Sequence, residues 1–171
     1  MRSWCVLSYL LLLSVVIASP AVGQGDDMLA RGSLSGVGNV RVVIESPGPE
    51  AEGEGLTSQR LRTDVEVKLR TAGVPVSDDS TRGGPFLYLN VGVFRGHQES
   101  IKGLYAYNVE VSFYQAVSLE RLPSYHPLGR TWSVSALGMV GQNHMVDGIR
   151  DAVRDLADLF INAYLAANPK R

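Results

Sequence analysis

The stretch NHMVDGIRDAVRDLADLFINAYLAANP, residues 143–169, decides the fold of this chain. Its apolar side chains recur every three or four residues, which is the pattern of a helix with one broad buried face. That face comprises Met145, Ile149, Ala152, Val153, Leu156, Leu159, Phe160, Ala163, Tyr164 and Ala167. Asn143 is placed to cap the start, and Asn168-Pro169 ends the helix because the residue before a proline is pushed out of the α region. The sequence therefore predicts a long helix that covers a core.

Residues 1–23 have the pattern of a secretory signal peptide. Arg2 supplies the positive start, an apolar run follows over 5–18, and Ala21-Val22-Gly23 is a small-x-small cleavage site before Gln24. The apolar run spans about fourteen residues, fewer than the roughly twenty that a membrane-spanning helix needs. An uncleaved membrane anchor is thus the less favoured alternative. Because Cys5 stands at the start of the apolar run rather than after it, we expect no lipid attachment there.

The composition of the remaining chain excludes several function classes. Cys5 is the only cysteine, so the exported chain has no disulfide, no catalytic thiol and no cysteine–metal site. Without Arg2, 15 Lys and Arg stand against 17 Asp and Glu, and no basic tract is present. We therefore expect no nucleic-acid partner and, after signal cleavage, no membrane span. The length fits one domain with a single core.

The rest of the chain predicts a two-layer α+β sandwich. We expect residues 24–38 to be a flexible lead-in and 39–171 to be a single domain. A helix is predicted over 57–72, with Thr57 or Ser58 as N-cap and Gly73 just after its end. Loops or turns are expected at 46–55, 78–85, 96–103 and 120–129. Strands are predicted over 40–45, 74–77, 86–95, 105–119 and 131–140.

The element order is thus β-α-β-β-β-β-α, which implies a mixed, mostly antiparallel sheet with two helices on one face. Each of the long strands alternates apolar with polar side chains, so the apolar face of the sheet has to be the one under the helices.

Residues that could carry catalysis are scattered. The chain contains no nucleophile elbow, zinc-protease motif or phosphate-binding loop, and we expect no cofactor. Glu50, Glu52 and Glu54 lack the closing geometry of a calcium loop, so we expect no metal there. A trio of Ser133, His126 and Asp147 is possible, but nothing in the spacing selects it. The sequence favours a protein without enzymatic activity.

The second face of the predicted sheet is the remaining distinctive feature. It has two interpretations: the solvated side of an antiparallel sheet, or a recognition surface in which tyrosines and adaptable polar groups contact a protein. Our candidate binding residues on this face are Tyr88, Asn90, Asn108, Glu110, Ser112, Tyr114 and Ser133.

Several segments resemble an uncharacterised family of small exported bacterial proteins. They are GLTSQRLRTDVEVKLRTAG (55–73), YAYNVEV (105–111), TWSV (131–134) and IRDAVRDLADLFINAYLAANPK (149–170). The resemblance implies no activity and transfers no functional residue. The order of elements is also similar to the N-terminal domain of the Tol-system periplasmic protein, a likeness of fold alone.

Three functions follow as hypotheses. The first is a periplasmic or secreted module that binds an envelope protein, or itself, through the exposed sheet face or an edge strand. The second is a small-ligand-binding domain with a pocket between the helices and the loops at 78–85 and 120–129. The third, least favoured, is a hydrolase of unrecognised type.

Overall fold

The computed structural model describes residues 25–77 and 84–169. The predicted signal peptide, most of the loop at 78–85 and the last two residues lie outside the described part. The helices are α1 (Met28–Gly32), α2 (Pro49–Gly53), α3 (Ser58–Thr71) and α4 (Met145–Ala167). The strands are β1 (Arg41–Ile44), β2 (Phe86–Arg95), β3 (Leu104–Ala116) and β4 (Leu128–Gly141). Single turns of 3₁₀ helix, η1 and η2, occupy Glu99–Ile101 and Gln142–His144.

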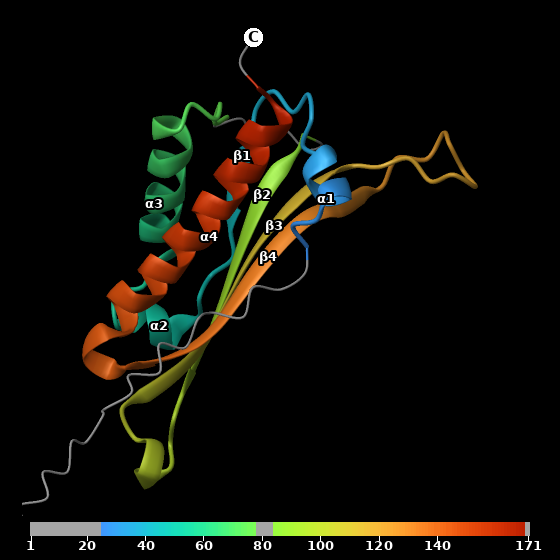
Figure 1. Cartoon of the computed structure of the whole chain (residues 1–171). Helices are drawn as coiled ribbons and strands as arrows, with labels where there is room; N and C mark the ends of the chain where they lie inside the picture. Colours follow the sequence, from blue (N-terminus) through green and yellow to red (C-terminus); the bar gives the residue numbers. More distant parts are fainter. Residues whose placement is uncertain (1–24, 78–83, 170–171) are drawn as a thin grey trace, which may run out of the picture.

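The predicted two-layer α+β class is confirmed. The described strands form one sheet in the order β1-β2-β3-β4, with β1 parallel to β2 and the other neighbours antiparallel. Helices α3 and α4 lie on one face of this sheet, and the β2–β3 and β3–β4 hairpins extend past them at opposite ends (Figure 1). The sheet is thus longer than its helical cover.

One predicted strand is much smaller than expected. Residues 74–77 make a single parallel bridge, between Val76 and Val40. The Val40 N–H donates to the Pro75 carbonyl at 2.8 Å, and the Ser77 N–H donates to the Val40 carbonyl at 3.0 Å. A proline in so short a segment removes one ladder donor, which keeps the pairing from extending.

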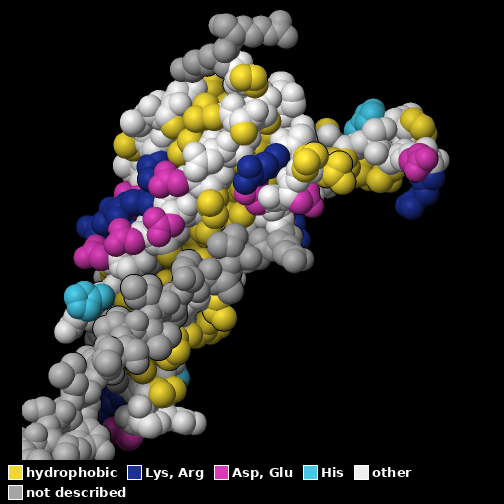
Figure 2. Space-filling model, viewed as in Figure 1, with side chains coloured by type: hydrophobic (Ala, Val, Ile, Leu, Met, Phe, Trp, Pro, Cys, Tyr) yellow, Lys and Arg dark blue, Asp and Glu magenta, His cyan; other side chains and the backbone are white. Residues whose placement is uncertain are grey.

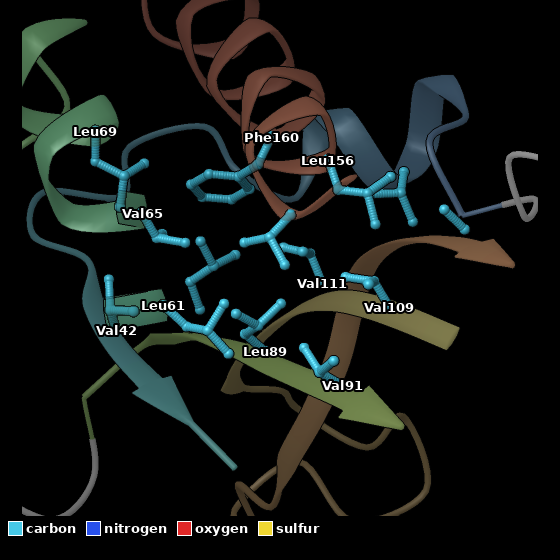
Figure 3. Close-up of a cluster of buried hydrophobic side chains, with 14 of the residues drawn as sticks. Val42, Leu61, Val65, Leu69, Leu89, Val91, Val109, Val111, Leu156 and Phe160 are labelled. Atoms are coloured by element: carbon cyan, nitrogen blue, oxygen red, sulfur yellow. The ribbon is translucent and has the colours of Figure 1, made fainter. Parts of the chain in front are cut away.

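The core lies between the helix layer and the inner face of the sheet, where the labelled side chains of Figure 3 point toward one another. Phe160 of α4 is its aromatic centre. Its ring lies 5.6 Å from that of Phe113, 5.2 Å from that of Trp132 and 6.1 Å from that of Tyr164, centroid to centroid. The predicted apolar stripe of the last helix thus packs on the apolar face of the long strands.

The helix ends agree with the sequence in three places and differ in one. Thr57 caps α3 by accepting from the Arg60 N–H, and Gly73 follows the helix with φ +81°, a left-handed value that suits glycine. Helix α4 ends at Ala167, before Asn168-Pro169, as predicted. The prediction of Asn143 as its N-cap is wrong. Residues 142–144 form η2 instead, and α4 begins at Met145.

Two turn segments hold more regular structure than expected. Residues 46–55 include α2, which starts at Pro49, a residue favoured in the first helical turn, and buries Ala51. The segment 120–129 was predicted to exclude a regular element, but β4 begins within it, at Leu128. The Val117 N–H donates to the Pro127 carbonyl at 2.9 Å, so the hairpin ladder continues up to the proline.

Residues 25–38, for which the sequence predicted a flexible lead-in, pack against the domain. Leu34 is fully buried in the core. The Tyr164 hydroxyl donates to the Val37 carbonyl at 2.7 Å, and the Asn168 side chain donates to the Leu34 carbonyl and accepts from the Gly36 N–H. The end of α4 therefore holds this segment in place.

Ion pairs join the two long helices. Arg150 of α4 makes a bidentate pair with Asp64 of α3, at 2.7 and 2.9 Å, and Lys68 pairs with Asp158 at 2.7 Å. Figure 2 shows acidic and basic side chains interleaved over this helix layer. Among the described residues, no helix has both the length and the apolar character needed to cross a membrane.

Candidate functional site

The seven candidate residues lie on one face of the sheet, the outer face, which α3 and α4 leave uncovered (Figure 1). The strand register arranges them in cross-strand rows. One row joins Tyr88, Ser112 and Ser133, and the next joins Asn90 and Glu110 to Ser135. Tyr114 lies beside Phe86 at one end, and Asn108 lies between Gly92 and Leu137 toward the other. Alternation along each strand and the pairing between strands together produce this surface.

An aromatic cluster occupies one half of the outer face. The ring of Tyr114 stacks on that of Phe86 at 5.3 Å, and it meets Tyr88 edge to face at 6.0 Å. The guanidinium of Arg41 lies 5.2 Å from the centre of the Phe86 ring, within cation–π distance. All three rings are half-buried, so they are held in place and still present area to a partner.

Glu45, just after β1, is a part of this surface that the sequence analysis missed. Its carboxylate accepts hydrogen bonds from the Tyr88 hydroxyl and the Asn90 amide. The Tyr88 hydrogen bond, followed by that of Asn90, holds the pKa of Glu45 below its ordinary value. The same contact raises the pKa of the Tyr88 hydroxyl, which therefore remains a donor. The parallel pairing of β1 with β2 brings Glu45 here.

Glu110 is the second carboxylate of the outer face, and it is also paired. It accepts from the Ser112 hydroxyl at 2.8 Å and from Arg130 Nη1 at 2.5 Å. Ser112 is fully buried beneath its neighbours. The prediction of Ser112 as a contact residue is therefore corrected: its hydroxyl supports Glu110 and cannot touch a partner.

Ser133 is partly covered by the chain itself. The Ser133 N–H donates to the Gly25 carbonyl at 3.3 Å. A Cβ on Gly25 would lie 2.2 Å from the Ser133 carbonyl oxygen and 2.4 Å from its hydroxyl, so only glycine allows this approach. The Trp132 indole N–H donates to Asp26 at 2.8 Å and extends the contact. The backbone before α1 thus lies against the start of β4.

The other half of the outer face is apolar. The register aligns Phe94, Ala106 and Met139 across three strands, with Leu137 in the adjacent row. Phe94 is 67% exposed, and Leu137 and Met139 are each 68% exposed. The sequence pattern weakens near Gly138, and for that reason these side chains were not among the candidates.

The structure does not bring together the catalytic trio weighed from the sequence. His126 lies in the hairpin before β4, and Asp147 lies in the first turn of α4, after that strand. The fourteen residues of β4 separate these two positions, which is on the order of 45 Å in extended strand. Ser133 lies in the sheet between them. Among the described residues, no group of three His, Cys, Asp or Glu is arranged to hold a metal ion.

The described residues line at least two hollows. One, of about 300 Å³, lies between β4 and α4, with Tyr107, Gly138, Asp151 and Asp155 in its lining. The other, of about 210 Å³, lies at the β2–β3 hairpin beside Phe94. Neither is in the place predicted for a ligand pocket, and residues 78–83 of that place lie outside the described part.

No family model matches the chain, and no curated protein matches it. Several solved structures show similarity, and two of them are bacterial lipoproteins. One is a minor lipoprotein from Acinetobacter baumannii, with 13% identity, a TM-score of 0.42, and coverage of 77% of this chain and 93% of that one. The other is the rare lipoprotein B from Shewanella oneidensis, with 14% identity, a TM-score of 0.40, and coverage of 74% and 94%. The similarity to the Tol-system domain is not shown.

Proposed function

We propose that this chain is an exported, non-enzymatic module of the bacterial envelope that binds another envelope protein, or a second copy of itself, through the outer face of its sheet. Export is supported by the signal-peptide pattern of residues 1–23, which predicts cleavage near Gly23 and release into the periplasm or the medium. Nothing in the chemistry of the described residues favours catalysis over binding.

The observation that carries the proposal is the cluster of Phe86, Tyr88 and Tyr114. Phe86 and Tyr88 both pack against Tyr114 on an uncovered sheet face, so the three rings offer a large apolar area at a small cost in side-chain entropy. Interfaces are enriched in such residues, and a few of them supply most of the binding free energy.

The charged groups around the cluster support the same reading. Glu45 accepts hydrogen bonds from two neutral side chains, and Glu110 accepts from Ser112 and forms an ion pair with Arg130, so a partner meets carboxylates whose hydrogen bonds are already formed. Burial of a hydrogen-bonded charge costs less than burial of an isolated one. This half of the face therefore combines aromatic rings with polar groups beside them, a combination common in protein interfaces.

Site-specific photo-crosslinking in the producing bacterium tests the proposal. A photo-reactive amino acid at Tyr88 should yield one discrete protein adduct, and Tyr114→Ala should reduce that adduct at least about tenfold, since truncation of a central aromatic costs 2 kcal/mol or more. The matched control is Tyr125→Ala, which removes a tyrosine that is 60% exposed in the β3–β4 hairpin.

The adduct should be unchanged by Tyr125→Ala. An adduct that survives Tyr114→Ala at full yield, or that forms equally well from a probe at Tyr125, would show that the outer face is not the binding surface.

A further inference from the structure

The outer edge of β4 is a second surface with the properties of a binding site. In the described part of the sheet β4 is the last strand, paired with β3 on one side only. Its register is regular from Ser133 to Gly141. The Ser133 N–H already donates away from β3, to Gly25. Since the N–H groups of a strand point alternately to its two sides, those of Ser135, Leu137 and Met139 point away from β3 as well.

These groups have no backbone partner among the described residues. Residues 131–141 contain no Lys, Arg, Asp, Glu or Pro, the residues with which proteins usually prevent an exposed edge from pairing. Leu137 and Met139, beside the edge, are largely exposed on the outer face. The edge therefore keeps the hydrogen-bonding capacity and the apolar neighbours that an added strand requires.

On the helix side, the same edge borders the larger hollow, of about 300 Å³. Two glycines leave this space open. A Cβ on Gly138 would lie 2.5 Å from the Tyr107 ring, and one on Gly148 would lie 3.1 Å from Val140. Alternate side chains of a strand added to β4 would point to this side and enter the hollow.

The lining of the hollow determines which side chain fits. Tyr107, Ala152 and Leu156 provide apolar walls, and Asp151 and Asp155 provide carboxylates. Asp151 pairs with Arg154, whereas Asp155 has no ion pair within the described residues. Lys and Arg have long apolar stems with a cationic end, which complements apolar walls that lead to a free carboxylate.

We propose that the β4 edge from Ser135 to Val140 binds an extended segment of a partner protein by strand addition, with a Lys or Arg side chain of that segment in the hollow toward Asp155. Main-chain hydrogen bonds would supply the affinity, and the hollow would supply the preference for a basic side chain. This inference concerns a different surface from the aromatic cluster and does not depend on the outer-face proposal.

Synthetic peptides test the inference directly. The probe is a peptide of alternating valine and threonine with one central arginine. Its matched controls carry glutamate in place of the arginine, or N-methyl groups on alternate amides so that the backbone cannot pair. Binding to the exported protein, with its N-terminus defined by mass spectrometry, is followed through the amide NMR signals of Ser135, Leu137 and Met139.

The arginine peptide should shift these three signals, the glutamate peptide should bind at least about tenfold more weakly, and the N-methylated peptide should not bind. Asp155→Asn should weaken binding of the arginine peptide about three- to tenfold. Glu99→Gln, which neutralises a carboxylate in the β2–β3 hairpin, should leave that binding unchanged. Tyr114→Ala should leave peptide binding unchanged, which separates this test from that of the outer face.

Leu137→Pro removes one outward N–H without touching the bonds to β3, and it should abolish binding if circular dichroism shows a folded chain. Equal binding of the arginine and glutamate peptides, or shifts confined to the aromatic cluster, would overturn the inference.

Two further results would also overturn it in favour of another occupant. The first is a dimer in sedimentation that Leu137→Pro dissociates. The second is protection of the three amides from exchange in the protein alone, together with failure to bind any of the peptides.

Discussion

The same strands form both faces of the sheet, and the two faces differ in burial. The inner face, with Leu87, Leu89 and Val91 of β2, is buried under the helices as part of the hydrophobic core. The outer face places Phe86, Tyr88 and Asn90 of the same strand where a partner can reach them. Side chains one residue apart therefore differ in their surroundings: those on the inner face pack in the core, whereas outer-face residues such as Tyr88 stay partly exposed.

Two phenylalanines provide the sharpest test of this contrast. Phe160→Ala should lower the free energy of unfolding by about 3–5 kcal/mol, because it opens a cavity among three aromatic neighbours. Phe94→Ala, on the outer face, should change it by less than about 0.5 kcal/mol. Urea denaturation measures both. Equal losses would mean that the outer face also contributes to the core.

The ion pair between Asp64 and Arg150 should have an effect on stability that is smaller than that of Phe160 and larger than that of the outer-face contacts. Asp64→Asn should lower the free energy of unfolding by about 1–2 kcal/mol at neutral pH, because Arg150 loses a bidentate, largely buried partner. The Arg150 hydrogen bonds, opposed by burial, lower the pKa of Asp64. A carboxyl whose pKa is lower in the folded state stabilises above its unfolded pKa, and this stabilisation is lost as pH falls through the folded value.

The difference in free energy of unfolding between wild type and Asp64→Asn should therefore be constant above about pH 5 and should shrink in more acidic solution. Asp155→Asn is the matched control on α4, since Asp155 has no ion pair among the described residues, and it should change the free energy of unfolding by less than about 0.5 kcal/mol at neutral pH. A difference that stays the same down to the acid limit would exclude the ion pair as its cause.

The smallest effect is expected on the outer face. Tyr88→Phe removes the hydroxyl that donates to Glu45, so the pKa of Glu45 should rise toward its ordinary value. Carbon-detected NMR titration of the Glu45 carboxyl measures this change, with Tyr125→Phe as control. We expect no measurable shift in the thermal midpoint, since both groups lie at the solvated surface. An unchanged Glu45 pKa would contradict the contact.

Long elements were predictable because their evidence is local. The strand predicted over 86–95 has those bounds in the structure, and the helix predicted over 57–72 is α3 with its two caps. The elements that were predicted wrongly are short or irregular. Helix α2 has only five residues, and the start of α4 follows a 3₁₀ turn that displaces the predicted cap. Segments this short contain too few periods for a pattern to emerge.

The candidate site was predicted in part. The period of two along each strand placed all seven residues on one face, but it could not show that Ser112 is buried or that Gly25 lies against Ser133. Glu45, Arg41 and Arg130 were missed because their roles depend on register between strands. The pairing of β1 with β2 bridges about forty residues of intervening chain, and no local pattern encodes it.

By itself, the sequence determined which side of each element is apolar, and hence that two helices must cover one face of a mixed sheet. The tertiary structure alone decided which strand lies at the edge, which residues meet across the strands, and where the hollow beside Asp155 opens. The physical reason is the range of the interactions. Alternation reflects the geometry of neighbouring residues, whereas register and edges depend on contacts between residues far apart in the chain. The helix at 145–167 illustrates both kinds of information. Its apolar stripe could be predicted from the sequence, but Phe113 and Trp132, the residues that contact its Phe160, became known only from the fold.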